Sequence, residues 1–220
     1  TNTSLLTLQT NQPVNNNVFL DSSTNALAIT RAGNPTQGTF SPYGANWSNY
    51  FDGTGDYLSI ANNAALNLSS GNFTIEAWVY YTGVNINSSI IDKDGIFNST
   101  NSSYGLGLQA SKLSFGVGSG NGISYSQGIV SSTNFLINEW VHVAAVKSGS
   151  TLTLYQNGIS IASATQSGTI IDGAKAVLVG YQSGQPTAQY FSGYISNLRV
   201  VKGVAVYTGT FTVPTSPLTS

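Results

Sequence analysis

The chain has 220 residues, of which 40% are hydrophobic and only 7% are charged, and its formal net charge is −1. This charge balance excludes a basic nucleic-acid-binding protein, because phosphate binding requires a cluster of positive side chains. The chain contains no cysteine and a single histidine, which excludes a disulfide framework, a thiolate nucleophile and a metal site built from several histidines of one chain.

Strands rather than helices are predicted along the chain, because β-branched and aromatic residues alternate with polar ones over short stretches. The only helical candidate is one turn at 62–68, since no window of about 11 residues or more keeps a helical period. In chain order, we expect strands at residues 26–31, 48–51, 57–60, 72–81, 88–92, 104–109, 112–117, 123–126, 139–147, 151–155, 159–164, 176–180, 189–194 and 195–201.

The amino-terminal region has a weaker pattern than the rest of the chain. Residues 1–40 are expected to contribute amino-terminal strands that pack on the main body, through Leu5, Leu6, Leu8, Val18 and Phe19. No linker divides the chain, so residues 1–220 are expected to form one domain. No apolar run approaches the roughly 20 residues of a membrane-spanning helix, and we therefore expect no membrane insertion.

Residues 72–81 show the clearest alternation. One face carries Phe73, Ile75, Ala77, Val79 and Tyr81, and the other carries Thr74, Glu76, Trp78 and Tyr80. Residues 139–147 are largely apolar on both faces, which predicts a central strand that is covered on both sides.

A hairpin is predicted where residues 151–155 and 159–164 flank Gln156-Asn157-Gly158. Asn-Gly is the preferred pair of a type I′ turn, because both residues tolerate a positive φ. Many short strands at even spacing are typical of an all-β sandwich or barrel.

Four segments occur in a characteristic order: FDGTGDYL at 51–58, NFTIEAWV at 72–79, WVHVA at 140–144 followed by LYQNG at 154–158, and FSGYISNLRV at 191–200. They resemble the laminin-G-like domains of the concanavalin A-like lectin/glucanase superfamily. The resemblance implies an antiparallel two-sheet jelly-roll sandwich.

The carboxyl-terminal segments 199–207 and 211–218 resemble the tails of such modules in structural proteins of marine and cyanobacterial phages. This resemblance implies a location on a virion surface or outside the cell. A cysteine-free surface that is rich in Ser, Thr and Asn is consistent with that location.

Catalysis is not expected. Laminarinase-type relatives carry E-x-D-x-x-E on one strand, and a retaining glycosidase needs two carboxylates about 5–5.5 Å apart. The two glutamates are Glu76 and Glu139, and the residues two positions further on are Trp78 and Val141, so the motif is absent. The sequence therefore predicts a non-enzymatic protein with no catalytic residues.

His142 and Glu76 both fall within predicted strands. His142 has no cationic neighbour in sequence, so we interpret it as a buried histidine with a hydrogen-bond partner. Glu76 would also need a partner if it is buried, and Arg199 and Lys147 are the candidates.

A calcium site is predicted in the loop that opens with Asp92 and Asp94. The resemblance implies one Ca²⁺ at the rim of the sandwich, and this ion takes about 6–8 oxygen ligands. Alternatively, one of these acids pairs with Lys93. A second candidate, Asp52 to Asp56, is equally typical of a turn. Residues 180–183 contain no acid, so a second calcium ion is not expected.

A carbohydrate site is predicted at the rim loops. Sugar rings stack on aromatic faces, while amides and carboxylates bind hydroxyl groups. Related domains bring the loop from Asp92 and the segment Tyr181-Gln182 together at one rim. The predicted sugar-binding residues are Asn98, Tyr104, Tyr125, Tyr181 and Gln182, with Tyr43, Trp47, Tyr190, Asn101, Asn121 and Gln185 as wider candidates. The alternative is that these tyrosines only cap sheet faces.

Three functions remain open. The first is a virion surface module, such as a phage fibre, tail or capsid decoration, that recognises host-surface glycans. The second is a purely structural module that contacts neighbouring virion proteins, and the third is a secreted bacterial adhesion domain. An aromatic groove would favour the first and an exposed apolar patch the second. A net charge near zero is also compatible with a homo-oligomer.

Overall fold

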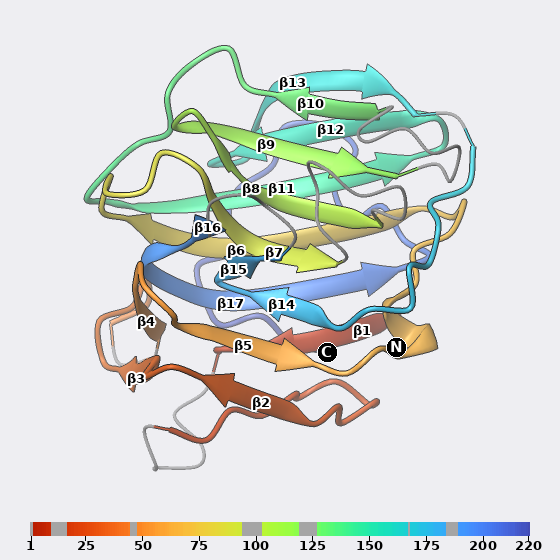
Figure 1. The fold of residues 1–220 in the computed structure, drawn as a ribbon. Coiled ribbons are helices and arrows are strands. Elements are labelled where there is room, and N and C mark those ends of the chain that lie inside the picture. The colour runs from red at the N-terminus through yellow and green to blue at the C-terminus, as the bar shows by residue number, and fades with distance from the viewer. Residues whose placement is uncertain are drawn as a thin grey trace.

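The computed structural model describes residues 2–9, 17–44, 48–93, 103–118, 127–166, 168–183 and 189–220. Two large antiparallel sheets lie face to face (Figure 1), and the one short helix within these ranges is the 3₁₀ turn η1 (Ala64–Leu66). The predicted all-β, two-sheet fold class is confirmed. Among the described residues, no helix has the length and apolarity needed to span a membrane.

The first sheet has eight strands. The order across the sheet is β13 (Ile159–Thr165), β12 (Thr151–Gln156), β11 (Trp140–Ser148), β6 (Phe73–Tyr81), β17 (Ser192–Lys202), β4 (Ser48–Asp52) and β3 (Thr36–Gly38), and β1 (Thr3–Thr7) also pairs with β17. Strand β17 thus joins the two ends of the chain in one sheet.

The second sheet has seven strands. Its order is β10 (Gln127–Val130), β9 (Lys112–Val117), β8 (Tyr104–Gln109), β7 (Ser88–Lys93), β14 (Val177–Val179), β5 (Tyr57–Ile60) and β2 (Ile29–Ala32). A small pair, β15 (Tyr181–Gln182) and β16 (Gln189–Tyr190), lies against β7.

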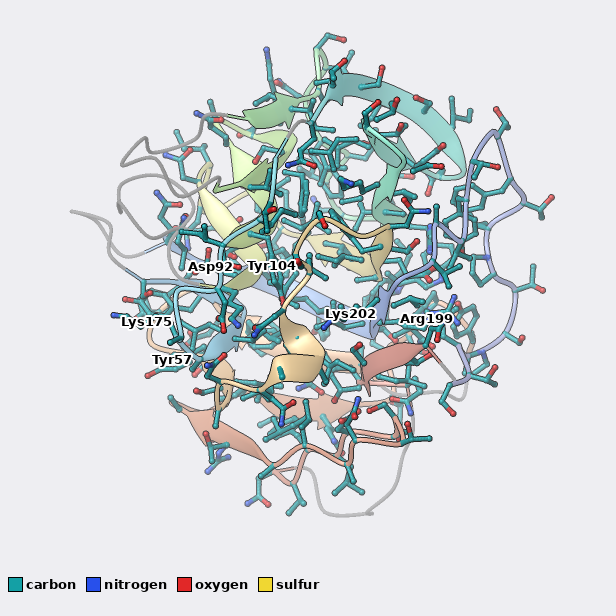
Figure 2. All side chains as sticks on the ribbon, turned by 90° about the vertical axis from the view of Figure 1, so that its right-hand side faces the viewer. Tyr57, Asp92, Tyr104, Lys175, Arg199 and Lys202 are labelled. Atoms are coloured by element: carbon teal, nitrogen blue, oxygen red, sulfur yellow. The ribbon has the colours of Figure 1, made fainter. Side chains whose placement is uncertain are left out.

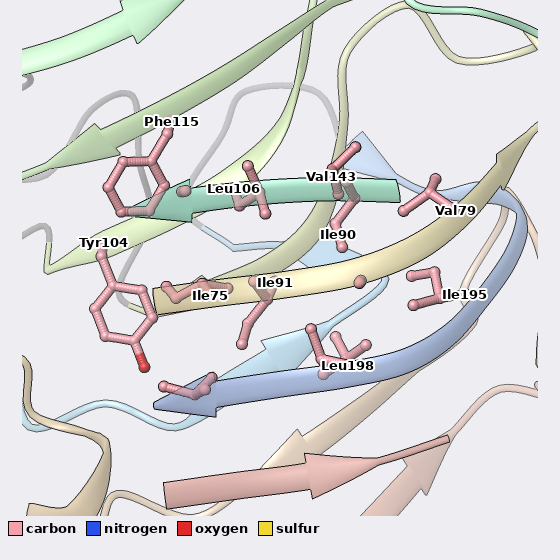
Figure 3. Packing of buried hydrophobic residues seen from close by; sticks show 14 of the residues in the cluster. Ile75, Val79, Ile90, Ile91, Tyr104, Leu106, Phe115, Val143, Ile195 and Leu198 are labelled. Atoms are coloured by element: carbon pink, nitrogen blue, oxygen red, sulfur yellow. The ribbon is translucent and has the colours of Figure 1, made fainter. Parts of the chain in front are cut away.

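The hydrophobic core fills the space between the two sheets. Alternate residues of each strand point inward, and Figure 3 shows Ile75, Val143 and Leu198 of one sheet together with Leu106 and Phe115 of the other. All five are essentially inaccessible to solvent. This alternation leaves every second residue of each sheet on an outer face, where the candidate sites lie.

Most predicted strands are confirmed to within two residues at each end, and 57–60, 104–109 and 112–117 match their strands fully. The predicted break between 194 and 195 is wrong, because β17 continues through a bulge at which Asn197 has a φ of 53°. The short strand β3 was not predicted, and β2 begins three residues later than expected. The predicted strand 123–126 lies outside the described residues.

The amino-terminal region packs largely as expected. Leu5, Leu6, Leu8 and Phe19 are buried, whereas Val18 is 39% exposed. Strand β1 is antiparallel to β17. The predicted hairpin at Asn157-Gly158 is confirmed, since both residues have a positive φ, of 49° and 79°.

The carboxyl-terminal tail covers part of the outer face of the eight-stranded sheet. Tyr207 and Phe211 stack on each other with 3.6 Å between ring centroids and pack against Ala144, Val146 and Tyr155. The prediction that residues 139–147 form a strand covered on both sides is therefore confirmed.

A buried carboxylate holds this tail in place. Glu76 Oε2 accepts a hydrogen bond from Tyr207 Oη at 2.7 Å and lies 3.1 Å from His142 Nε2. Glu76 Oε1 accepts from Arg199 Nε at 2.9 Å and from its Nη2 at 2.6 Å. Burial would raise the pKa of Glu76, but these neighbours outweigh it and hold that pKa below its ordinary value. Of the two predicted partners of Glu76, Arg199 is confirmed, whereas Lys147 donates instead to the carbonyl oxygens of Ser70 and Gly149.

We expect Glu76→Gln to destabilise the fold by about 3–5 kcal/mol, because Arg199 loses the charge that compensates its burial. The ionised carboxylate stabilises the native state above its unfolded pKa of about 4.3, and this contribution is lost as the pH falls through the lower native pKa. Urea unfolding of both proteins between about pH 3 and pH 7 tests this. If the stability of the variant fell as steeply with decreasing pH as that of the parent, this role of Glu76 would be contradicted. The variant Tyr207→Phe removes only one hydrogen-bond donor and should cost about 1–3 kcal/mol.

We expect Gly193→Ala to cost about 3 kcal/mol or more in the free energy of unfolding. Gly193 has a φ of +136°, and a Cβ there would collide with the carbonyl oxygen of Tyr80 on β6. Gly209→Ala is the matched control, because a Cβ added there would have nothing within 4 Å. It should change the free energy of unfolding by no more than about 0.5 kcal/mol. Chemical denaturation measures the free energy of unfolding of both variants. Equal losses of stability in the two variants would disprove the prediction.

Candidate functional site

The outer face of the seven-stranded sheet has a floor of glycines. Gly128, Gly116 and Gly105 are successive cross-strand partners on β10, β9 and β8. Their sequence neighbours Phe115 and Leu106 point into the core, so these three positions face outward. A strand glycine leaves room for another group to approach the backbone closely. A row without side chains therefore runs across three strands.

A cavity of about 270 Å³ lies at this floor. It is lined by Gln109, Ser114, Phe115, Gly116, Gly128, Ile129 and Val130. Ligand pockets begin at about 300 Å³, so this space suits a single small unit rather than a large cofactor. The polar side chains that line the cavity are the amide of Gln109 and the hydroxyl of Ser114, which form hydrogen bonds and carry no charge.

Asp92 continues the glycine row on β7, where it pairs with Gly105 on one side and Leu178 on the other. Its side chain is fully buried. Figure 2 shows Asp92 and Tyr57 on the side of the molecule away from Arg199, which belongs to the opposite sheet. Asp92 is therefore part of the sheet, as the predicted strand 88–92 has it, and the loop that it was expected to open begins after Lys93.

Three tyrosines gather beside this row. Tyr181 and Tyr190 stack with ring centroids 4.5 Å apart and an interplanar angle of 17°, and Tyr57 lies 5.1 Å from Tyr181. Burial and the nearby Tyr190, Tyr57 and Asp92 raise the pKa of Tyr181, so its hydroxyl stays protonated at neutral pH. Asp92 and Tyr181 thus lie close enough to interact, whereas residues 94–102 of the predicted loop lie outside the described residues.

Two amides lie next to the tyrosines. Gln182 and Gln189 are cross-strand partners on β15 and β16, and both are buried. Gln182 Nε2 and Gln189 Oε1 have no hydrogen-bond partner within the part of the chain that the structure describes. A donor and an acceptor are thus left unused beside an aromatic stack.

Tyr104, predicted to bind sugar, lies in the core. It is 1% exposed, and its hydroxyl donates to the carbonyl oxygen of Leu66 at 3.1 Å. Burial raises the pKa of Tyr104. No ring face is open to a ligand, because Tyr104 shares the inner face of β8 with Leu106 and Leu108. The other predicted residues Asn98 and Tyr125 lie outside the described residues.

The calcium site stays a prediction. Asp94 lies outside the described residues, and these residues contain no group of three or more His, Cys, Asp or Glu that could hold a metal ion. In the second candidate loop the carboxylates stabilise the turn. Asp52 accepts a hydrogen bond from Thr54 N at 2.7 Å, and Asp56 accepts one from Asp52 N at 3.2 Å. Calcium content and melting temperature with and without EDTA test the site.

Lys93 does not pair with Asp92. Alternate residues of a strand point to opposite sides, so Lys93 turns away and its Nζ donates to Asp172 Oδ1 at 2.8 Å. Asn62 and Asn67 accept from the same nitrogen, so the buried Lys93 reaches a cluster of polar side chains at the surface. The hydrogen bond from Lys93 holds the pKa of Asp172 below its ordinary value.

His142 and Glu76 form the cluster that most resembles catalytic machinery, with Arg199 and Tyr207 beside them. Both side chains are 0% exposed under the carboxyl-terminal tail. The prediction of a buried, hydrogen-bonded His142 is confirmed. This cluster holds the tail and has no open side for a substrate.

The sequence analysis missed the glycine floor and Tyr57. The signal for the floor is the pattern Tyr104-Gly105-Leu106-Gly107-Leu108, in which the outward positions of a strand are glycines. Tyr57 carries no local signal, because its meeting with Tyr181 depends on the pairing of β5 with β14.

Several solved structures share this fold. The binding domain of Paraclostridial Mosquitocidal Protein 1 superposes with a TM-score of 0.72 at 15% identity, over 93% of this chain and 49% of that chain. A botulinum neurotoxin type C structure gives a TM-score of 0.66 at 16% identity, over 91% and 48% of the two chains. This chain therefore spans about half the length of the toxin structures that it matches.

A third structure matches over nearly its full length. Domain 4 of AbnA, a GH43 extracellular arabinanase from Geobacillus stearothermophilus, gives a TM-score of 0.64 at 14% identity, over 93% of this chain and 94% of that chain. A search of the curated proteins finds no match. The laminin G family model of the concanavalin A-like lectin/glucanases superfamily matches residues 52–206. Because this match covers more than half of the chain, the protein belongs to that laminin G-like family.

Proposed function

We propose that the protein is a non-enzymatic carbohydrate-binding module that recognises glycans at the outer face of its seven-stranded sheet. The observation that carries the proposal is the stack of Tyr57, Tyr181 and Tyr190 beside a floor of glycines. The stack offers aromatic faces, and the floor lets a ligand come close to the backbone.

The chemistry of the neighbouring groups fits a sugar. The apolar C–H face of a pyranose or furanose ring stacks on tyrosine, while hydroxyl groups bind to carboxylates and amides. Gln182 and Gln189 supply two amides next to the stack. A neutral hydroxyl ligand also matches the uncharged lining of the cavity on β8, β9 and β10 of the same sheet.

The structural relatives support this class of ligand. Domain 4 of the arabinanase is described in complex with arabinotriose, and it is the relative matched over nearly its whole length. Cell entry of botulinum neurotoxin type C is described as dependent on interaction with two ganglioside molecules, although this chain corresponds to about half of the toxin structure. Binding of a neutral oligosaccharide to this chain therefore rests mainly on the comparison with the arabinanase domain.

We further propose that the module acts on a virion surface, as part of a phage fibre, tail or capsid decoration. The resemblance of segments 199–207 and 211–218 to tails of phage structural modules supports this location. Weak binding by each module would then be strengthened by many copies, because linked sites raise the effective concentration.

A structural role in assembly is the second candidate. Val84, Ile86 and Ile137 are 68%, 56% and 52% exposed. Ile137 lies against Gly83, since a Cβ on that glycine would be 3.5 Å from Ile137 Cγ2. Exposed aliphatic side chains that lie together are typical of protein contacts. This observation favours a neighbouring virion protein as the partner of the surface around Val84, Ile86 and Ile137.

We expect Tyr181→Ala to weaken glycan binding by about thirtyfold, or about 2 kcal/mol, because it removes the central ring of the stack. Tyr181→Phe keeps the ring and should retain most of the affinity. Binding is measured by retardation on immobilised polysaccharide from host cells and by titration with arabinotriose and a sialylated oligosaccharide.

The exposed Ile159 on edge strand β13 supplies the control variant, Ile159→Ala, which should bind as the parent does. Melting temperatures of all variants separate lost binding from lost folding. Equal affinities of the parent and the Tyr181→Ala protein would remove this site from the proposal. No binding of the parent to any of these glycans would leave the assembly role as the better account.

A further inference from the structure

A second set of aromatic residues forms a row across the other sheet. Tyr50, Tyr194, Tyr80 and Trp140 are successive cross-strand partners on β4, β17, β6 and β11. Their neighbours Phe51, Val79 and Val141 are buried in the core, so the row faces outward. Because adjacent strands lie about 4.8 Å apart, the row spans about 14 Å.

The rings of this row contact one another and one further ring. Tyr50 and Tyr194 have centroids 5.0 Å apart, and Tyr80 and Trp140 have centroids 5.8 Å apart. Phe40, which follows β3, lies 4.9 Å from both Tyr80 and Tyr194. These five residues are called the aromatic row below. Their contacts fix the rings in position, so little side-chain entropy remains to be lost when a ligand stacks on them.

The carboxyl-terminal tail leaves this part of the face uncovered. Tyr207 and Phe211 make their ring contacts with His142 and Tyr155, further along the strands. Phe40 is 45% exposed and Tyr50 39% exposed, and the other three rings are half-buried. The tail thus divides the outer face into a covered part and an open aromatic part.

We propose that the aromatic row is a second carbohydrate-binding surface, which takes a neutral glycan chain independently of the tyrosine stack on the opposite sheet. Tyrosine and tryptophan combine a flat apolar face with a hydrogen-bonding edge, which is the combination that a sugar ring requires. Asp52, which is exposed and two residues beyond Tyr50 on the same face, can accept hydrogen bonds from sugar hydroxyls.

The exposed area favours a glycan over a protein partner. An aromatic side chain contributes about 150–250 Å², so the exposed parts of Phe40 and Tyr50 together offer on the order of 200 Å². A standard protein interface needs about 800 Å² from each partner. A ligand that relies on these rings alone is therefore a small one, such as a chain of stacked sugar rings, whereas a protein partner would have to contact the surrounding surface as well.

The charge of the surface favours a neutral glycan over an anionic one. The aromatic row itself contains no charged side chain, and the cation on this face, Arg199, is engaged by Glu76. The carboxylate of Asp52 would repel a sialylated or sulfated ligand. Two glycan sites on opposite faces would let one module engage two chains, which raises its avidity without any new contact.

Nuclear magnetic resonance titration tests the proposal with the whole chain. The indole N–H signal of Trp140, assigned through Trp140→Phe, is followed during addition of arabinotriose and of neutral trisaccharides of glucose and mannose. We expect at least one of these sugars to shift it, and Tyr50→Ala and Phe40→Ala each to raise the dissociation constant at least tenfold. Tyr50→Phe keeps the ring and should preserve the shift.

The variant Tyr181→Ala separates the two sites. It should leave the Trp140 shift unchanged, and the Tyr50→Ala protein should still bind at the tyrosine stack. The proposal is overturned if no neutral sugar shifts the Trp140 signal, or if Tyr50→Ala and Phe40→Ala leave that shift unaltered. Concentration-dependent self-association that Phe40→Ala abolishes would also overturn it, because a second copy would then be the occupant. If the parent protein bound sugar at the aromatic row and not at the tyrosine stack, only the first site would be disproved.

Discussion

The buried carboxylate of Glu76 is the interaction on which the outer face of the eight-stranded sheet depends. It joins β6 to Arg199 of β17, to His142 of β11 and to Tyr207 of the tail. A charge without these donors could not be buried at such a position. Because the donors come from two neighbouring strands and the tail, this carboxylate ties the tail to the sheet, together with hydrogen bonds from Val206 N to Thr74 and from Phe211 N to Gly158.

The outer face of the seven-stranded sheet is defined by a row of positions without side chains. Gly105, Gly116 and Gly128 remove side chains from three adjacent strands, and Asp92 and the tyrosine stack stand beside them. The two outer faces therefore differ in kind. One is a bare floor with a polar and aromatic border, and the other is a continuous row of rings. A jelly roll can carry two ligand surfaces in this way, since its core uses only the inner faces.

Sequence patterns predicted structure well where alternation and turn chemistry agree. Residues 57–60 and the Asn157-Gly158 hairpin are examples, because their signals are local. The pattern failed at β17, because the chain breaks at Phe191, between β16 and β17, and then continues as one strand across the expected break between 194 and 195. It also misplaced Tyr104, although the alternation with Leu106 and Leu108 already put that ring on the core face.

By itself, the sequence determined the all-β class, the family and the absence of the glucanase carboxylate motif, since each follows from local alternation or from ordered segments. Only the tertiary structure decided which aromatic side chains meet. Tyr57 reaches Tyr181 through the pairing of β5 and β14, and Tyr50 reaches Trp140 through three further pairings. The physical reason is that strand register depends on partners far away in the chain, and a shift of one residue would turn each of these rings to the other face.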